Sequence, residues 1–167
     1  MEYICNGSTY TFDKGYIALP LTVEGLPETI VVGGERFTIK SKHHVSLAHA
    51  KGIAEKYALP DGEKKITELF CEFTTNHDVS FVRYTGEFRL ARSEERKSVV
   101  ALCEVSHIKD FPAFLKERLG IEVPNQPTHV TLYTLVFDVG IGLNSLEELA
   151  AKSSVIEAPA ELSGVLC

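Results

Sequence analysis

Two four-residue segments of the chain repeat one pattern: a histidine, an apolar residue, a small hydroxyl residue and a leucine. They are His44–Leu47 and His129–Leu132. Histidine exchanges protons near neutral pH because its ordinary pKa is about 6.5. A neighbouring hydroxyl can donate a hydrogen bond to an anion. Two such pairs could therefore supply an acid, a base and two donors to one phosphate group.

Both segments lie in sequence typical of β-strands, in which side chains alternate between two faces. The alternation predicts that polar and apolar members separate: His44 and Ser46 opposite Val45 and Leu47, and His129, Thr131 and Tyr133 opposite Val130 and Leu132. Each strand would then present its imidazole and hydroxyl to a site and anchor its apolar residues in a core. Tyr133 could add a donor or stack on a base, or simply line the cleft.

The surrounding patterns predict an α+β fold with mainly antiparallel sheets. Strands are expected at 15–21, 36–48 with a break at 40–43, 79–90, 98–105, 128–137 and 153–158. Helices are expected at 51–57, 63–75, 110–119 and 146–151, the last begun by a capping box of Ser145 and Glu148. The glycines Gly140 and Gly142 are expected to shape a turn, because their motif is too short for a nucleotide-binding fingerprint.

The composition is that of a soluble globular protein, with 44% apolar and 24% charged residues among 167. That length fits one domain or two small lobes. No apolar run approaches the roughly 20 residues of a membrane span. The first ten residues lack the cationic stretch and apolar core of a secretory signal, so a cytoplasmic location is expected. The net charge of −6 argues against tracking along extended nucleic acid, although one phosphate could be held locally.

Four cysteines are scattered singly along the chain: Cys5, Cys71, Cys103 and Cys167. This pattern favours neither a zinc site nor a disulfide framework. Cys71 and Cys103 lie in apolar sequence, where a buried free thiol is expected.

The remaining histidines lack the motif, and surface or structural roles are expected for them. His43 should point away from the face of His44, whereas His49, His77 and His107 have no hydroxyl partner. A basic cluster lies near the expected hairpin and comprises Arg83, Arg89, Arg92, Arg96 and Lys97. A solvated face is the favoured interpretation, with steering of an anionic substrate as the alternative.

The two histidine segments resemble the signature of the two-histidine (2H) phosphoesterase superfamily, which includes RNA ligase-like proteins and cyclic phosphodiesterases. His44 and Ser46 match its first motif, and His129 and Thr131 match its second. The run at 16–20 is similar to the first strand of many members. The resemblance implies one bilobal domain over residues 1–167, with two pseudo-symmetric lobes of antiparallel sheet and helices facing each other across a cleft.

The resemblance also implies an activity, namely hydrolysis of a 2′,3′-cyclic phosphate or a 2′–5′ linkage, with reverse ligation possible. The substrate would be an RNA end or a small nucleotide. His44 and His129 would be the acid–base pair, with His129 the base, and Ser46, Thr131 and Tyr133 would contact the substrate. This chemistry requires no metal, cofactor or membrane. Two alternatives remain: a nucleotide-binding module without turnover, and a structural domain in which the repeated motif is coincidental.

Overall fold

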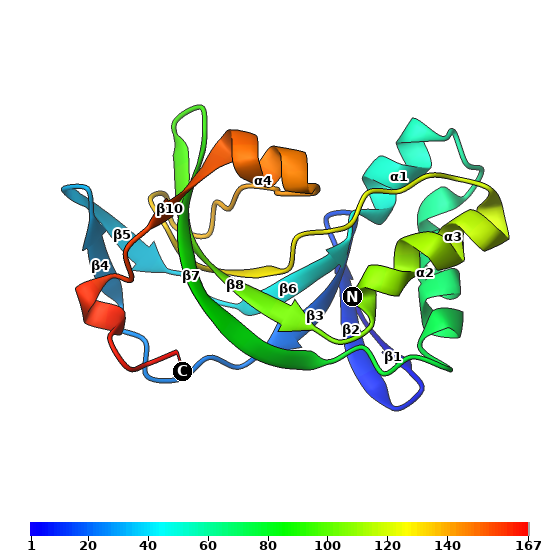
Figure 1. The fold of residues 1–167 in the computed structure, drawn as a ribbon, viewed down its shortest axis with the longest axis horizontal. Helices are drawn as coiled ribbons and strands as arrows, with labels where there is room; N and C mark the ends of the chain where they lie inside the picture. Colours follow the sequence, from blue (N-terminus) through cyan, green and yellow to red (C-terminus); the bar gives the residue numbers. More distant parts are fainter. Residues whose placement is uncertain (167) are drawn as a thin grey trace.

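The computed structural model describes residues 1–166 as an α+β fold, with ten strands that pair antiparallel in one sheet and four α-helices (Figure 1). The sheet order is β1-β2-β3-β6-β9-β8-β7-β10, and β5 pairs with both β4 and β9. The strands are β1 Glu2–Cys5, β2 Ser8–Asp13, β3 Tyr16–Leu21, β4 Thr29–Val32, β5 Glu35–Ile39, β6 His43–Ala48, β7 Phe81–Ser93, β8 Arg96–Val105, β9 His129–Thr134 and β10 Ser153–Ile156. The helices are α1 Ala50–Lys56, α2 Gly62–Phe73, α3 Phe111–Leu119 and α4 Leu146–Lys152, with short 3-10 turns at Ile108–Asp110 and Ala160–Leu162.

Most elements expected from the sequence are present. The break expected at 40–43 separates β5 from β6, and the long hairpin of β7 and β8 turns at Glu94. The capping box is half formed: the Ser145 hydroxyl accepts from the Glu148 amide at 3.0 Å, but the Glu148 carboxylate accepts from the Asn144 amide. The expected strand at 128–137 is shorter in the structure, since β9 ends at Thr134.

The sheet separates two clusters of apolar side chains. The larger covers one face, where α2 places Ile66, Phe70 and Phe73 at helical spacing with no more than 1% of each exposed. Phe70 meets Phe111 of α3 edge to face. The smaller cluster lies on the other face, where Leu149 of α4 packs with Ala91, Ile141 and Leu143. Figure 1 accordingly shows α1, α2 and α3 grouped together and α4 apart from them.

The two pseudo-symmetric lobes implied by the family resemblance are not seen. The two motif strands, β6 and β9, are direct neighbours in one continuous sheet instead of belonging to separate sheets that face each other. The physical reason is the direct pairing of Val45 with Val130, which joins what would be the inner edges of the two lobes.

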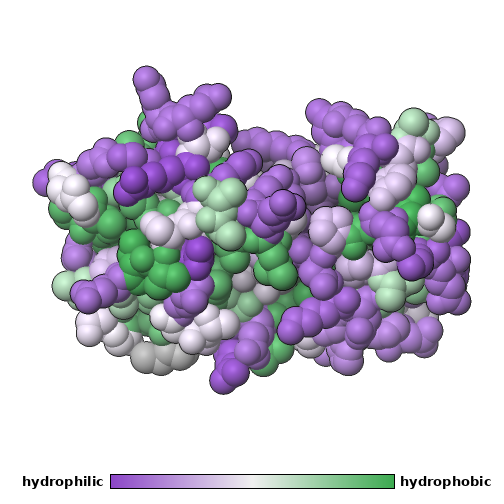
Figure 2. Space-filling model, turned by 45° about the horizontal axis from the view of Figure 1, so that its top comes forward, coloured by the Kyte–Doolittle hydropathy of each residue, from purple (hydrophilic) through white to green (hydrophobic). Residues whose placement is uncertain are grey.

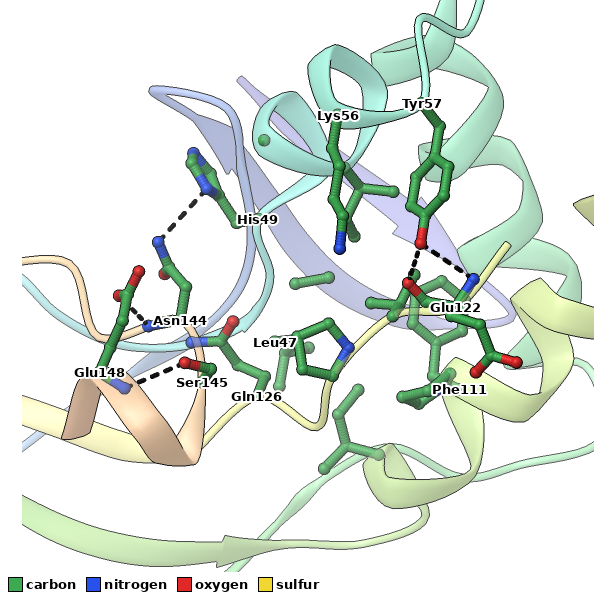
Figure 3. A pocket seen from close by; sticks show the side chains of 17 residues that line it. Leu47, His49, Lys56, Tyr57, Phe111, Glu122, Gln126, Asn144, Ser145 and Glu148 are labelled. Atoms are coloured by element: carbon green, nitrogen blue, oxygen red, sulfur yellow. Dashed lines mark hydrogen bonds between the residues drawn. The ribbon is translucent and has the colours of Figure 1, made fainter. Parts of the chain in front are cut away.

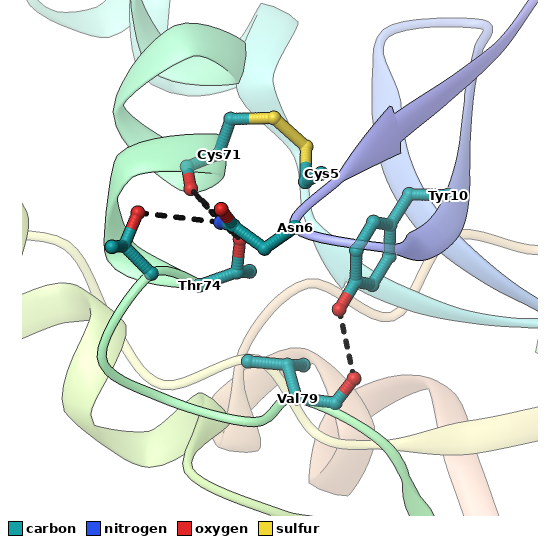
Figure 4. Close-up of a disulfide and its surroundings, with 7 residues drawn as sticks. Cys5, Asn6, Tyr10, Cys71, Thr74 and Val79 are labelled. Atoms are coloured by element: carbon teal, nitrogen blue, oxygen red, sulfur yellow. Dashed lines mark hydrogen bonds between the residues drawn. A yellow bond between two sulfur atoms is a disulfide. The ribbon is translucent and has the colours of Figure 1, made fainter.

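A disulfide joins Cys5 at the end of β1 to Cys71 in α2, with 5.1 Å between their Cα atoms (Figure 4). The expectation of a free thiol at Cys71 was therefore wrong, because the β1–β2 hairpin, which was not predicted, brings Cys5 to the helix. The side chain of Asn6 reinforces the junction by donating to the Cys71 carbonyl at 3.0 Å. Cys103 is a buried free thiol, as expected, and burial raises its pKa to about 12. Cys167 lies outside the described residues.

The surface is mixed in character. In the space-filling view, hydrophobic surface is more extensive on the half that carries β4, β5 and β10 than on the half that carries α1, α2 and α3 (Figure 2). Large exposed apolar side chains near that half include Val31, Phe137 and Val155. Within residues 1–166, no helix has the length and apolar character needed to cross a membrane.

Candidate active site

The register between β6 and β9 brings the two motifs together. Val45 pairs with Val130 in an antiparallel ladder. In this register, the residue before Val45, His44, lies opposite Thr131, and the residue after it, Ser46, lies opposite His129. Residues directly opposed in such a ladder have Cβ atoms about 4.5–5.5 Å apart, and diagonal neighbours lie about 7–8 Å apart. The two imidazoles are therefore diagonal partners in a compact square of four polar side chains.

All four side chains lie on the face opposite the main core. Val45, Leu47 and Val130 belong to the large apolar cluster, so the alternating residues of the same strands point to the other face. The smaller apolar cluster borders that face. Leu102, which pairs with His129 across the strands, also packs against this cluster. The structure thus brings together the four residues of the two sequence motifs.

The two motif strands also share a backbone irregularity. Ser46 and Ala48 pair with the consecutive residues Ala18 and Ile17 of β3, so Leu47 is an extra residue. Likewise Thr131 and Tyr133 pair with the consecutive residues Val100 and Val99 of β8, so Leu132 is extra. Each motif thus ends in a β-bulge at its leucine. The strands β3, β6, β9 and β8 are related by an approximate local two-fold axis through the Val45–Val130 pair.

The second bulge changes the position expected for Tyr133. A bulge reverses the alternation of side chains beyond it, so Tyr133 faces the main core instead of sharing the face of Thr131. The side chain is fully buried, and its hydroxyl donates to the carbonyl oxygen of Pro27 at 2.7 Å. The expectation that Tyr133 lies beside the motif residues is not met.

Replacement of Tyr133 by Phe should therefore affect stability and not chemistry. The change leaves the Pro27 carbonyl without its donor, which should cost about 1 kcal/mol. In a chain of this size, that corresponds to a fall in Tm of about 2–4 °C. Thermal unfolding measures the first effect and turnover per folded molecule the second. A catalytic group usually contributes about 100-fold or more. A loss of turnover larger than about twofold would therefore contradict the placement of Tyr133 outside the site.

His129 is held in one orientation and one tautomer. Its side chain is buried, and its Nδ1 lies 3.1 Å from the carbonyl oxygen of Pro127. Because a carbonyl oxygen only accepts, Nδ1 carries the proton and Nε2 keeps its lone pair in the neutral form. Burial lowers the pKa of His129, and the Pro127 contact opposes this shift. The residue is suited to accept a proton at Nε2.

His44 is partly buried and surrounded by charges of both signs. Burial lowers its pKa, and so do the positive charges of Lys40, His129 and His43, whereas Asp13 acts in the opposite direction. The two motif histidines are thus close enough to influence each other electrostatically. Within residues 1–166, no hydrogen bond involves the side chains of His44, Ser46 or Thr131, so all three are available to a ligand.

Lys40 is a neighbour of the site that the motifs did not indicate. Its amide donates to the carbonyl of Leu132 at 3.0 Å, which places it at the end of the square formed by His44 and Thr131. A Cβ added to Gly140 would lie 3.9 Å from its Nζ. Gly140 therefore lies beside the Lys40 side chain, whereas the turn expected at Gly140 and Gly142 lies earlier, at residues 137–138. Sequence could not indicate Lys40, because its position depends on the pairing of β5 with β9.

A pocket of about 270 Å³ lies beyond the opposite end of the square (Figure 3). His49, which follows β6, and Gln126, which precedes β9, are among its lining residues, with α1, α3 and the start of α4 around them. Asn144 donates to His49 Nδ1 at 3.3 Å, and Tyr16 stacks on the same imidazole with 4.2 Å between ring centres. Gln126 donates to the Leu143 carbonyl at 2.7 Å. The pocket combines an apolar floor with polar groups, as ligand sites commonly do.

The other histidines and the basic cluster do not belong to the square. His43 alternates with His44 and faces the side of Val45, and His77 stacks on Phe73. Arg83 of the hairpin forms an exposed ion pair with Glu104, which fits the interpretation as a solvated face. Arg89 does not fit it, because its side chain is mostly buried and donates to the Ser153 hydroxyl at 2.7 Å.

The residues described contain no group of three or more His, Cys, Asp or Glu side chains that could hold a metal ion. No family model, curated protein or solved structure matches the chain. The family resemblance therefore rests on the motif residues, and any function has to be argued from the geometry around them.

Proposed function

We propose that the protein is a metal-independent phosphodiesterase that opens 2′,3′-cyclic phosphates, or cleaves 2′–5′ linkages, of RNA ends or small nucleotides. The observation that carries the proposal is the cross-strand square of His44, Ser46, His129 and Thr131. Two imidazoles at diagonal corners, with a hydroxyl beside each, form an arrangement that can surround one phosphate group.

The chemistry assigns a role to each corner. The base, His129, removes a proton from water through Nε2 as the water oxygen attacks phosphorus. The bond from phosphorus to the ribose oxygen breaks on the far side, and protonated His44 donates its proton to that oxygen. The hydroxyls of Ser46 and Thr131 donate to the non-bridging oxygens, which gain negative charge in the transition state. The product is a ribose phosphomonoester.

The proposal does not require two lobes, because the strand pair itself supplies both motifs. Their local two-fold relation replaces the pseudo-symmetry expected of separate lobes. None of the four motif side chains lines the pocket beyond the end of Ser46 and His129, and in this proposal the nucleoside attached to the reacting phosphate extends from the square toward it. Its amide groups on Gln126 and Asn144 and the imidazole of His49 suit a polar heterocycle.

The direct test is hydrolysis of a 2′,3′-cyclic nucleotide before and after treatment with EDTA. We expect turnover that survives chelation, because protein side chains supply the acid, the base and the donors. Heat-unfolded protein carried through the same purification is the control. Activity lost on chelation and restored by a divalent ion would reject the mechanism.

Replacing the motif hydroxyls should weaken catalysis less than replacing the histidines. Ser46→Ala and Thr131→Ala each remove one donor to the phosphate and should lower kcat/KM about tenfold. Thr134→Val is the matched control for Thr131→Ala, since both residues lie in β9 and the buried hydroxyl of Thr134 has no partner. It should keep wild-type kcat/KM. Equal losses in Thr131→Ala and Thr134→Val would indicate disturbance of β9 instead of loss of a phosphate contact.

The alternative is a module that binds a nucleotide on the same face without turnover. It predicts nucleotide affinity that depends on the same four residues and no product after long incubation. The buried His129 favours the enzyme, because a group held as a proton acceptor is not needed for binding alone.

A further inference from the structure

The ammonium of Lys40 forms no direct ion pair with a carboxylate among the described residues. The side chain is partly buried, and desolvation lowers its pKa. In the described chain, its ammonium takes part in none of the ion pairs or side-chain hydrogen bonds. Charged groups that leave water are normally paired, because desolvation otherwise costs several kcal/mol.

The carboxylate that acts electrostatically on Lys40, Asp138, is hydrogen-bonded to another residue. Both oxygens of Asp138 accept hydrogen bonds from Ser41, one from its amide at 2.9 Å and one from its hydroxyl at 2.6 Å. Asp138 therefore acts on Lys40 only at longer range, and the positive charge of Lys14 opposes it. Asp138 is thus paired with Ser41, and it forms no ion pair with the Lys40 ammonium among the described residues.

The position of Lys40 indicates which anion its ammonium would bind. Its backbone amide donates to Leu132, the residue after Thr131, and its Nζ lies beside Gly140. After burial, its positive charge has the largest effect on the pKa of His44. We infer that Lys40 is the phosphate-binding cation of the site, holding the phosphoryl group that lies between His44 and His129. This inference rests on the proposed function for its location, but it concerns anion binding and can be tested without turnover.

Inorganic phosphate is the probe, followed by calorimetry and by the NMR signals of the imidazoles. We expect wild-type protein to bind phosphate in the millimolar range and to shift the signals of His44 and His129. Lys40→Gln should weaken binding about tenfold or more, and Lys40→Arg should keep most of it. The matched control is Lys42→Gln, an identical change at an exposed position two residues away, which should bind like wild type.

Two further readouts separate binding from a structural role. Removal of the Lys40 charge should raise the pKa of His44, because that charge lowers it in the wild type. Lys40→Met should unfold at the wild-type temperature or above it, since it removes an unpaired charge from a partly buried position. A lower unfolding temperature would show that the fold itself holds the ammonium, and would overturn the inference.

The outcomes also distinguish this inference from the proposed function. Phosphate binding that depends on Lys40, without turnover of any cyclic nucleotide, would keep the anion site and reject the enzyme. If the wild type turns over a cyclic nucleotide, and Lys40→Gln keeps the wild-type phosphate affinity and kcat/KM, the proposed function stands and the role of Lys40 is rejected. Absence of phosphate binding to the wild type, or equal weakening in Lys42→Gln, would also reject it.

Discussion

Replacement of either motif histidine by alanine should lower kcat on a 2′,3′-cyclic nucleotide by about 100-fold or more. Each change removes one end of the proton transfer that the diagonal arrangement of His44 and His129 makes possible. The double variant should be far less than multiplicatively worse, because residues that act as one unit are not additive. Steady-state kinetics of the three variants measures both effects.

His43→Ala is the matched control, because His43 adjoins His44 but faces the other side of the sheet. It should retain turnover per folded molecule.

The pH profile is a second check. Burial lowers the pKa of both motif histidines. The base, His129, therefore stays unprotonated down to a lower pH than an ordinary histidine. The acid, His44, loses its proton at a lower pH than an ordinary histidine. The optimum of kcat/KM should therefore lie below about pH 6.5. Wild-type turnover in both single variants, with weaker nucleotide binding, would instead identify a binding module.

Reduction of the Cys5–Cys71 disulfide should destabilise the fold by about 2–5 kcal/mol. The bond closes a loop with a sequence separation of 66 residues, so its loss restores considerable freedom to the unfolded chain. The paired variant Cys5→Ser with Cys71→Ser should show a Tm roughly 10 °C below wild type. Cys103→Ser is the control for loss of a cysteine outside the bond.

Thiol counting on unfolded, unreduced protein checks the bond directly: Cys5 and Cys71 should resist alkylation until reductant is added. Equal Tm values with and without reductant would contradict a stabilising disulfide. The same count bears on location. Disulfides are rare in the cytosol, so the bond argues against the cytoplasmic location expected from the first ten residues, and that location stays a prediction.

The motif faces and most strands could be predicted because they depend on local alternation. The strand at 15–21 and the break at 40–43 follow from apolar spacing within a few residues of chain. The β1–β2 hairpin was missed although its turn was legible: Asn6 and Gly7, with φ of 52° and 86°, form the Asn-Gly pair typical of tight hairpins.

Features that depend on a partner strand could not be predicted. The orientation of Tyr133 reverses because of one extra residue, Leu132, which exists only relative to the register of β8. Lys40 reaches the site through the pairing of β5 with β9, and Cys71 finds Cys5 across 66 positions. Each is a consequence of tertiary pairing that leaves no periodic trace in the sequence.

The two bulged leucines have a consequence for the direction in which a substrate lies. Rotation about the local axis exchanges His44 with His129 and Ser46 with Thr131, so the square alone would accept a phosphodiester in either of two opposite orientations. The surroundings remove this ambiguity. The Pro127 carbonyl fixes the tautomer of only one imidazole, Lys40 lies at one end, and the pocket lies at the other. In the proposed enzyme, these differences would give a strand pair without polarity of its own a defined entry side for water and a defined exit side for the leaving oxygen.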